Sequence, residues 1–234
     1  MEIPSGAIGQ PVSLLEKVQR AQRVITKAVR RFPTSSIAVA WTGGKDSTVL
    51  LHLIRTFYHG RVPFPVFFND STMEFKEVYR FINRLEKVWG LKVFRVKHLD
   101  SDLATFSSLS PTNQVEFSRI MKINAISWAL DTYHWKAFMV AIRHDEHPAR
   151  SKETYFSKRS THFRIHPILH FTESDIWSYI KVNKVPYVSL YKKGYRSLGE
   201  RPFTRKAGKH GSERSGREPG KEFLMQRLRE LGYW

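Results

Sequence analysis

Cysteine is absent from the 234 residues of the chain. Thiolate catalysis, disulfides and cysteine-ligated iron–sulfur clusters are therefore excluded for this chain, because each needs a cysteine sulfur. Long apolar runs are also missing. No stretch approaches the roughly 20 apolar residues that span a bilayer, and the N-terminus lacks the apolar core of a secretory signal. The sequence predicts a cytoplasmic protein that does not enter a membrane.

Acidic residues are scarce relative to basic ones. The chain has 39 Lys and Arg against 21 Asp and Glu, a formal net charge of +18. Such a surface attracts anions, including nucleotides, sulfate, nucleic acid and acidic proteins. Between residues 192 and 221, ten basic residues accompany three glutamates. A basic run is most often a solvated face, so the charge keeps nucleic acid open as a partner without establishing it.

Apolar spacing predicts the order of helices and strands. Residues at helical spacing predict an N-terminal helix over 12–29. Strands are expected over 37–41, 64–68, 92–96 and 136–141, with helices over 45–57, 74–89, 113–132 and 173–183. A polar loop is expected over 143–161, followed by a strand-like stretch from 162. This alternation predicts an α/β fold with a mostly parallel sheet, helices on both faces and ligands beyond the carboxyl ends of the strands.

The composition changes near residue 192. We expect residues 1–191 to form one nucleotide-binding α/β domain and residues 192–234, the basic tail, to follow it with a short helix over 222–231. Tyr191, Tyr195 and Phe203 stand between glycines in this region. A solvated, disordered tail is one interpretation, but the aromatic residues favour a tail that folds over the site.

One short segment carries the strongest signal. In "SIAVAWTGGKDSTVLL", residues 36–51, an apolar run is followed by the loop Thr42-Gly43-Gly44-Lys45-Asp46-Ser47 and then by a helical pattern. Glycines let backbone N–H groups converge, a helix N-terminus adds donors, and lysine adds a positive charge. The alternative is a tight turn in which Asp46 or Ser47 caps the helix. The combination predicts a phosphate-binding loop whose spacing is not the Walker pattern.

Further candidates lie after the other strands. Asp70 ends the second strand, where a carboxylate can contact a ribose or adenine, or start an Asx-type turn. Arg143, Arg150 and Lys152 follow the fourth strand, and Arg164 lies in the next strand-like stretch. Guanidinium groups suit phosphate or sulfate oxygens, whereas a solvated charged loop is the alternative. Asp70 and these basic residues are predicted to reach the same edge of the sheet.

The loop resembles the PP-loop of the ATP pyrophosphatase superfamily, normally Ser-Gly-Gly-Lys-Asp-Ser, with Thr42 keeping the hydroxyl. Two later segments narrow the resemblance. The segment 143–153 and "HFRIHPILHFTESDIWSYI", residues 162–180, are similar to the ATP sulfurylase small subunit. "VPYVSLYKKGYRSLG", residues 185–199, is also similar to FMN adenylyltransferases. The resemblance implies an adenine nucleotide alpha hydrolase-like three-layer sandwich.

The basic tail is similar to another branch of the same superfamily, the phosphoadenylylsulfate reductases. "GYRSLGERPFT", residues 194–204, resembles a reductase segment Gly-Tyr-x-Ser-Ile-Gly-Cys-x-Pro-Cys-Thr, with Glu200 and Phe203 at the two cysteine positions. "GSERSGR", residues 211–217, also resembles the reductase tail. Those reductases form a thiosulfonate on a cysteine, so the resemblance concerns ancestry and not their chemistry.

What remains is adenylyl transfer, in which an acceptor attacks the α-phosphate of ATP and pyrophosphate leaves. The resemblance implies Lys45, Asp46 and Arg143 as catalytic residues. It implies nucleotide or anion contacts at Thr42, Gly43, Gly44, Lys45, Asp46, Ser47, Asp70, Arg150, Lys152 and Arg164. Mg²⁺ is expected on the phosphates, and no protein metal site is predicted, because two histidines without cysteines make a weak ligand set.

The acceptor stays open between three classes. Sulfate is favoured because the sulfurylase pattern extends furthest, and FMN comes second. The sulfurylase small subunit works with a GTPase subunit, so such a partner or a homo-oligomer is expected. A nucleic-acid-directed protein that modifies tRNA or DNA is the third class, which the charge supports. A nucleotide-binding module without catalysis is the remaining alternative.

Overall fold

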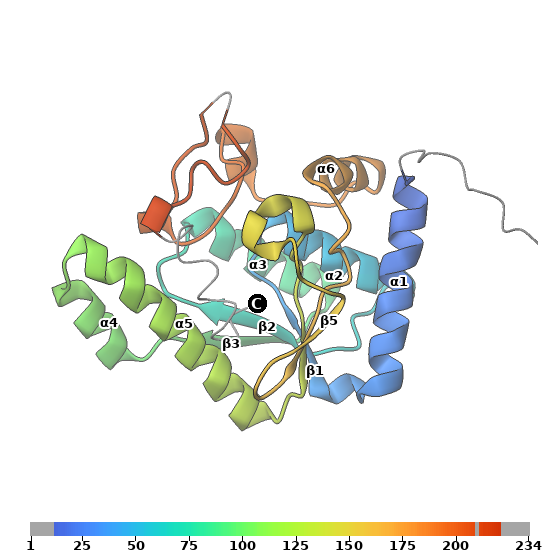
Figure 1. Cartoon of the computed structure of the whole chain (residues 1–234), viewed down its shortest axis with the longest axis horizontal. Coiled ribbons are helices and arrows are strands. Elements are labelled where there is room, and N and C mark those ends of the chain that lie inside the picture. The colour runs from blue at the N-terminus through green and yellow to red at the C-terminus, as the bar shows by residue number, and fades with distance from the viewer. Residues whose placement is uncertain (1–11, 209–210, 221–234) are drawn as a thin grey trace, which may run out of the picture.

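The computed structural model describes residues 12–208 and 211–220, and within them a six-stranded sheet carries helices on both faces (Figure 1). The strands are β1 (Ile37–Ala40), β2 (Val66–Asp70), β3 (Val93–Lys97), β4 (Ala137–Met139), β5 (Phe156–Lys158) and β6 (Phe163–Ile165). The helices are α1 (Leu14–Arg31), α2 (Lys45–Phe57), α3 (Lys76–Trp89), α4 (Asp100–Ser108), α5 (Pro111–Tyr133) and α6 (Glu173–Val182). The predicted α/β fold with a mostly parallel sheet is confirmed.

The strand order places the loops after β1 and β4 at the same end of the sheet. The order is β3-β2-β1-β4-β6-β5, and every neighbouring pair is parallel except β5 with β6. The chain runs outward from β1 to β3 and then returns to the other side of β1 with β4. Loops that follow β1 and β4 therefore diverge at the carboxyl end of the sheet, the position where such sheets bind ligands.

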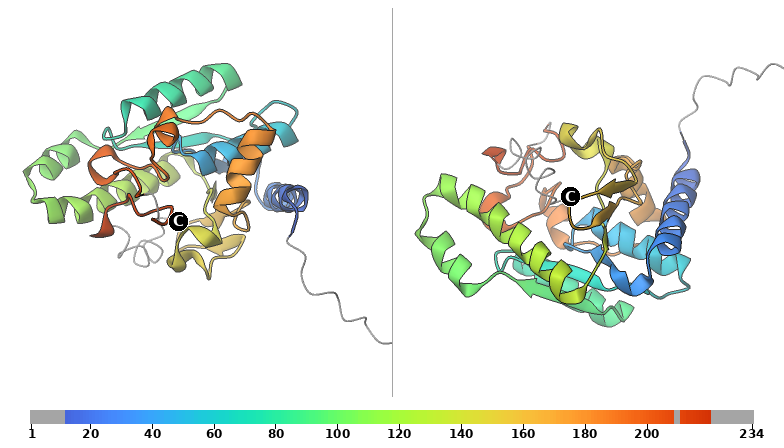
Figure 2. Two further views of the ribbon diagram at one scale, coloured as in Figure 1. Left: turned by 90° about the horizontal axis from the view of Figure 1, so that it is seen from above. Right: turned by 60° about the horizontal axis from the view of Figure 1, so that its bottom comes forward.

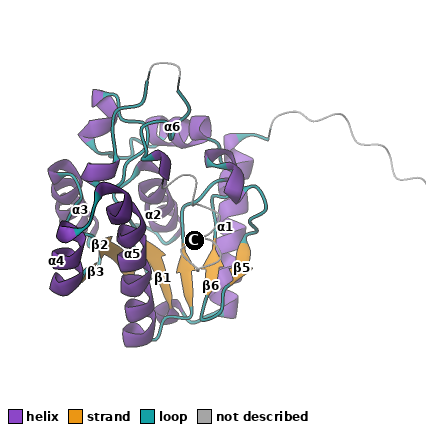
Figure 3. Cartoon of the chain, turned by 60° about the vertical axis from the view of Figure 1, so that its left-hand side comes forward, coloured by secondary structure: helices purple, strands orange, loops and turns teal. Residues whose placement is uncertain are grey.

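Alternation along the strands builds a core on each face of the sheet. Val39 and Phe68 point to one face, where they pack with α1, α2, α3 and α6. Ala38, Phe67 and Phe138 point to the other face, which α5 covers. Figure 3 shows the strands side by side with helices on either side. Because side chains alternate with a period of two, each strand contributes to both cores, and the result is a three-layer sandwich.

Three local expectations were inaccurate. The second strand lies two residues later than expected, since Pro65 has no N–H to donate and the ladder begins at Val66. Helix α4, of nine residues, was not predicted. The expected polar loop 143–161 contains 3₁₀ turns and the antiparallel edge strand β5, whose three residues are too few for a periodic signal. The expected helix 222–231 lies outside the described residues.

The described part of the basic tail (orange to red) lies at the top of Figure 1, as α6 does. Lys122 of α5 pairs with Glu200 of the tail at 3.0 Å, and Arg214 of the tail pairs with Glu146 at 2.6 Å. The views in Figure 2 agree, because the tail runs beside α5 (green) and the segment that follows β4 (yellow). No helix among the described residues is long and apolar enough to cross a membrane.

A buried histidine makes the stability of the fold depend on pH. His162 is buried with its ring edge on Phe138, at 5.8 Å between centroids. Burial, helped by the cations Arg164 and Arg159, lowers the pKa of His162 to about 3. The unfolded chain therefore binds this proton more tightly, and stability is lost as pH falls from the ordinary histidine pKa towards 3.

We expect the free energy of unfolding to fall by about 1–2 kcal/mol between pH 7 and pH 5 on account of His162 alone. His162→Phe keeps a planar ring without a titratable nitrogen, so its loss over the same range should be smaller by that amount. Urea denaturation of both proteins at the two pH values measures the difference. Equal losses in the two proteins would contradict a neutral His162 in the folded state.

Candidate active site

The predicted phosphate loop joins β1 to α2 and is shaped by its glycines. Gly43 has a φ of +73°, and a Cβ there would lie 3.0 Å from Val78 Cγ1. Gly44 is the N-cap of α2 but carries no side chain to cap it. The hydroxyls of Thr42 and Ser47 lie 3.2 Å apart and close the loop on itself. The first turn of α2 therefore presents backbone N–H groups that its own N-cap residue does not cap.

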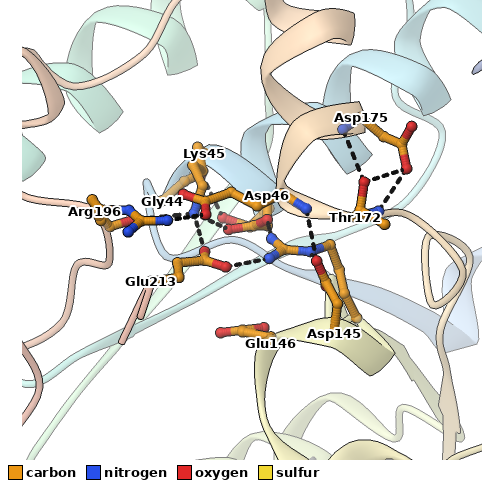
Figure 4. A network of polar contacts seen from close by, with 12 residues as sticks. Gly44, Lys45, Asp46, Asp145, Glu146, Thr172, Asp175, Arg196 and Glu213 are labelled. Carbon is orange, nitrogen blue, oxygen red and sulfur yellow. Dashed lines mark hydrogen bonds and ion pairs between the residues drawn. The ribbon is translucent and has the colours of Figure 1, made fainter. Parts of the chain in front are cut away.

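Lys45 lies inside this loop and points along it (Figure 4). Its side chain is 1% exposed, and Nζ lies 3.2 Å from Asp46 Oδ2, 3.2 Å from the Arg196 carbonyl and in contact with Glu213. Burial alone would lower the pKa of Lys45, but Asp46, Tyr191 and Glu213 outweigh it and hold the pKa above the ordinary value. The lysine is therefore a permanent cation at the loop.

Arg143 follows β4 and reaches the same place from the neighbouring strand. Its side chain is fully buried and donates to three carboxylates, those of Asp46, Asp145 and Glu213, with Nε–Oδ1 of Asp145 at 2.9 Å. Burial would lower the pKa of Arg143, yet these carboxylates raise it above the ordinary arginine value. Lys45 and Arg143 together form a pair of cations, called here the cation pair, at the carboxyl ends of β1 and β4.

A second set of charges lies beside the cation pair. Glu146 accepts from Arg150 and from Arg214, the latter at 2.6 Å. Burial would raise the pKa of Glu146, but the two arginines lower it, so the group is a carboxylate. A cavity of about 190 Å³ opens between the loops. Among its lining residues are Thr42, Gly44, Asp46, Ser47, Glu146, Arg150, Arg164, Tyr191 and Arg214.

Five predicted site residues are not among those that line this cavity, namely Gly43, Lys45, Asp70, Arg143 and Lys152, and of these Lys45 and Arg143 are buried in the ionic network beside it. Asp70 is buried at the end of β2, where Oδ1 accepts from the Thr72 N–H at 2.9 Å and from the Tyr79 hydroxyl at 2.6 Å. This is the Asx-type turn that the sequence also allowed. Lys152 is exposed and is not among the lining residues. A nucleotide contact of either residue stays a prediction.

The structure brings to the loop several residues for which the sequence predicted no specific contact there. The Tyr191 hydroxyl accepts from the Lys45 N–H at 2.9 Å, and Glu213 bridges Lys45 and Arg143. Glu213 and Arg214 belong to "GSERSGR", which was noticed only as a resemblance. Nothing in a lone Ser-Glu-Arg sequence indicates the distant partners of its charges, so no local signal could have found them.

The carboxylates of the site fit a metal ion only in a supporting role. Among residues 12–208 and 211–220, no group of three or more His, Asp or Glu side chains is placed to hold one. Asp46 pairs with Lys45 and Arg143, and Asp70 is engaged in its turn. Magnesium keeps water and phosphate ligands and needs few protein groups. Asp46 is the carboxylate nearest the loop that could join such an ion.

Glu200 and Phe203, at the positions of the two reductase cysteines, make other contacts here. Glu200 is 1% exposed and its carboxylate lies 3.0 Å from Lys122 Nζ. Phe203 is buried and packs on Phe106, at 6.1 Å between ring centroids, and on Met121. An ion pair and an apolar contact thus occupy the space in which the similar segment carries thiols.

The site combines a glycine-lysine loop after β1 with a buried arginine after the neighbouring strand β4. This combination defines a class of nucleotide-binding α/β proteins with a phosphate loop. Within that class, the family model of the phosphoadenosine phosphosulfate reductase domain matches residues 36–206. The chain belongs to this family, as its motifs predicted.

Relatives in the family carry a different activity in their names. Sulfate adenylyltransferase subunit 2 of Methylobacterium nodulans is 31% identical over an alignment of 230 positions. The alignment covers 85% of this chain and 72% of that protein. The protein of the same name from a Rhizobium species is 30% identical over an alignment of 246 positions, gaps included. That alignment covers 91% of this chain and 79% of that protein. These identities extend well beyond the loop.

Solved structures share the fold. Phosphoadenylyl-sulfate reductase from Candida auris superposes with a TM-score of 0.65 at 19% identity, covering 84% of this chain and 98% of that one. Candida glabrata FMN adenylyltransferase in complex with ATP superposes with a TM-score of 0.65 at 21% identity, covering 82% of this chain and 62% of that one. At such identities the likeness concerns the fold alone.

The loop geometry predicts how two glycines differ. Gly43→Ala places a Cβ at positive φ and against Val78 and Ile82, which should cost about 2–4 kcal/mol of unfolding free energy. Gly90→Ala is the matched control, because Gly90 also has a positive φ, +60°, but nothing lies within 4 Å of its added Cβ. It should cost about 1–2 kcal/mol. Thermal or urea unfolding compares the two, and equal losses would contradict the close contact at Gly43.

Proposed function

We propose that this protein binds ATP and transfers its AMP group to an anionic acceptor with release of pyrophosphate. The observation that carries the proposal is the cation pair, a buried lysine and a fully buried arginine beside a phosphate-type loop, in a chain without cysteine. A cysteine-dependent reduction is excluded for this chain, and the loop chemistry is what remains. Relatives named sulfate adenylyltransferase subunit 2 support the same reaction class.

The two cations suit the charge that develops in this reaction. An acceptor oxygen forms a new bond to the α-phosphorus of ATP, and the bond from that phosphorus to the bridging oxygen of pyrophosphate breaks. Negative charge grows on the leaving pyrophosphate, where Lys45 and Arg143 stabilise it. Asp46 contacts both cations and holds them in place. Magnesium supplies further charge neutralisation when bound with the nucleotide.

Sulfate is the acceptor that we propose first. It is already ionised, so no general base is required, and none was predicted. Arg150 and Arg164 line the cavity together with the tail residue Arg214 and suit the oxygens of a small oxyanion. FMN is the second acceptor, because an FMN adenylyltransferase shares the fold and its structure contains ATP. The net charge of +18 keeps tRNA or DNA as a third class.

A partner subunit and the location in the cell are also proposals. Relatives named "subunit 2" indicate that those proteins act with another subunit, and the sulfurylase resemblance suggests that this is a GTPase. A similar partner, or a homo-oligomer, is proposed for this chain. The cytoplasm is the proposed location, since ATP is available there.

The first test is pyrophosphate release from ATP and Mg²⁺ with sulfate, FMN and bulk tRNA added separately. Release should depend on one acceptor, with sulfate expected. Lys45→Ala removes a charge from the leaving-group side and should lower the rate about 100-fold or more. Lys181→Ala, an exposed lysine of α6, is the matched control and should leave the rate unchanged.

ATP binding by calorimetry accompanies the rate measurement. A protein that binds ATP but releases pyrophosphate only after a partner fraction is added would support the two-subunit form. A wild-type protein that binds neither ATP nor pyrophosphate would overturn the proposal, and so would release that is equal in wild type and Lys45→Ala.

A further inference from the structure

The described tail is folded as a unit that reaches the loop. Thr204 and Arg217 form an antiparallel bridge, and the Arg205 N–H donates to the Gly216 carbonyl at 2.7 Å. A Cβ on Gly216 would lie 2.2 Å from the Arg205 carbonyl oxygen, so the two strands of this bridge approach as closely as glycine permits. Glu213 lies beyond this bridge, next to Lys45 (Figure 4), and it also contacts Arg143.

Glu213 takes the position of an anion between the two cations. One carboxylate oxygen contacts Lys45 Nζ and the other contacts Arg143. Its side chain is 9% exposed, so the contact is shielded from solvent. The residue beside it, Arg214, is anchored on Glu146 at 2.6 Å. A bidentate carboxylate that bridges a lysine and an arginine has the charge and the acceptor arrangement of two phosphate oxygens.

The donors of Lys45 are fully used in this arrangement. An ammonium group has three N–H donors, and Nζ has three partners, namely Asp46, the Arg196 carbonyl and Glu213. Asp46 is adjacent in sequence to Lys45 and cannot move far from it. Glu213 is 168 positions away and reaches the lysine only through the fold of the tail. A phosphate that binds Lys45 must replace one partner, and Glu213 is the one that competes by charge.

The backbone of the loop is engaged by the same region. The Lys45 N–H, one of the first donors of α2, donates to the Tyr191 hydroxyl at 2.9 Å, and Tyr191 directly precedes the tail. Two donors of the loop, one from the backbone and one from the side chain, are therefore held by groups from the C-terminal part of the chain. Two independent contacts thus occupy the donors that a polyphosphate needs.

We propose that Glu213 is an internal anion that competes with the phosphates of ATP for Lys45 and Arg143, so that nucleotide binding requires its displacement. The inference rests on the proposed function, because it assumes that the cation pair receives phosphate. It assigns Glu213 a role that sets nucleotide affinity. A purely structural Glu213 would instead hold the two cations in position, and its loss would weaken the binding of any phosphate.

Inorganic pyrophosphate is the probe, and its affinity is measured by calorimetry at fixed ionic strength. Glu213→Gln removes the competing charge and should bind pyrophosphate and ATP at least fivefold more tightly than wild type. Glu218→Gln, a glutamate further along the same tail, is the matched control for the change in net charge and should shift affinity less than twofold. Glu213→Asp keeps the charge on a shorter side chain and should lie between wild type and Glu213→Gln.

The unfolding temperature, measured without and with pyrophosphate, is a second readout. Without ligand, Glu213→Gln should unfold at a lower temperature than wild type because it loses two ionic contacts, yet pyrophosphate should raise its unfolding temperature by more. Should Glu213→Gln not fold, Glu213→Asp carries the same comparison.

The outcomes separate the two proposals. If wild type binds ATP and Glu213→Gln binds it equally or more weakly, Glu213 is not a competitor, while the proposed function stands. If neither protein binds ATP or pyrophosphate, the cation pair is not a phosphate site and both proposals fail. Tighter binding by Glu213→Gln alone supports the competition.

Discussion

The arrangement of the site depends on the ion pairs of Arg143. A fully buried guanidinium loses its hydration and is stable only with carboxylates around it. Its partners come from three places: Asp46 from the loop after β1, Asp145 from the segment after β4, and Glu213 from the tail. Satisfying one arginine therefore brings together three parts of the chain that are distant in sequence, and the carboxyl end of the sheet is where they meet.

Asp145 extends this constraint to α6. Its second oxygen accepts the N–H of Glu173, the first residue of α6. The same glutamate accepts from Arg196 at 2.6 Å, and Arg196 offers its carbonyl to Lys45. The ionic groups thus form one continuous network from the loop through α6 to the tail. In a partly buried network of this kind, removing one member leaves another charge without compensation, so its members act together.

The sequence allowed the fold and the loop to be predicted because both depend on local patterns. Strand and helix periods give the alternating elements, and Gly43-Gly44-Lys45 has a chemistry that depends on neighbouring residues. Helix α4 and strand β5 were missed, and both are short, with nine and three residues. Glu213 could not be predicted as a partner of Lys45, because that contact depends on tail packing and not on any property of the residues next to it.

The residues at the two cysteine positions of the similar reductase segment are part of the packing of the tail. At the first cysteine position, Glu200 is buried against Lys122, and a thiol there would remove this ion pair. At the second, Phe203 fills an apolar contact with Phe106 that a thiol would leave partly empty. Both substitutions are integrated into the packing of the tail against α4 and α5. The tail thus contributes both ionic and apolar contacts, and its carboxylate Glu213 lies between Lys45 and Arg143.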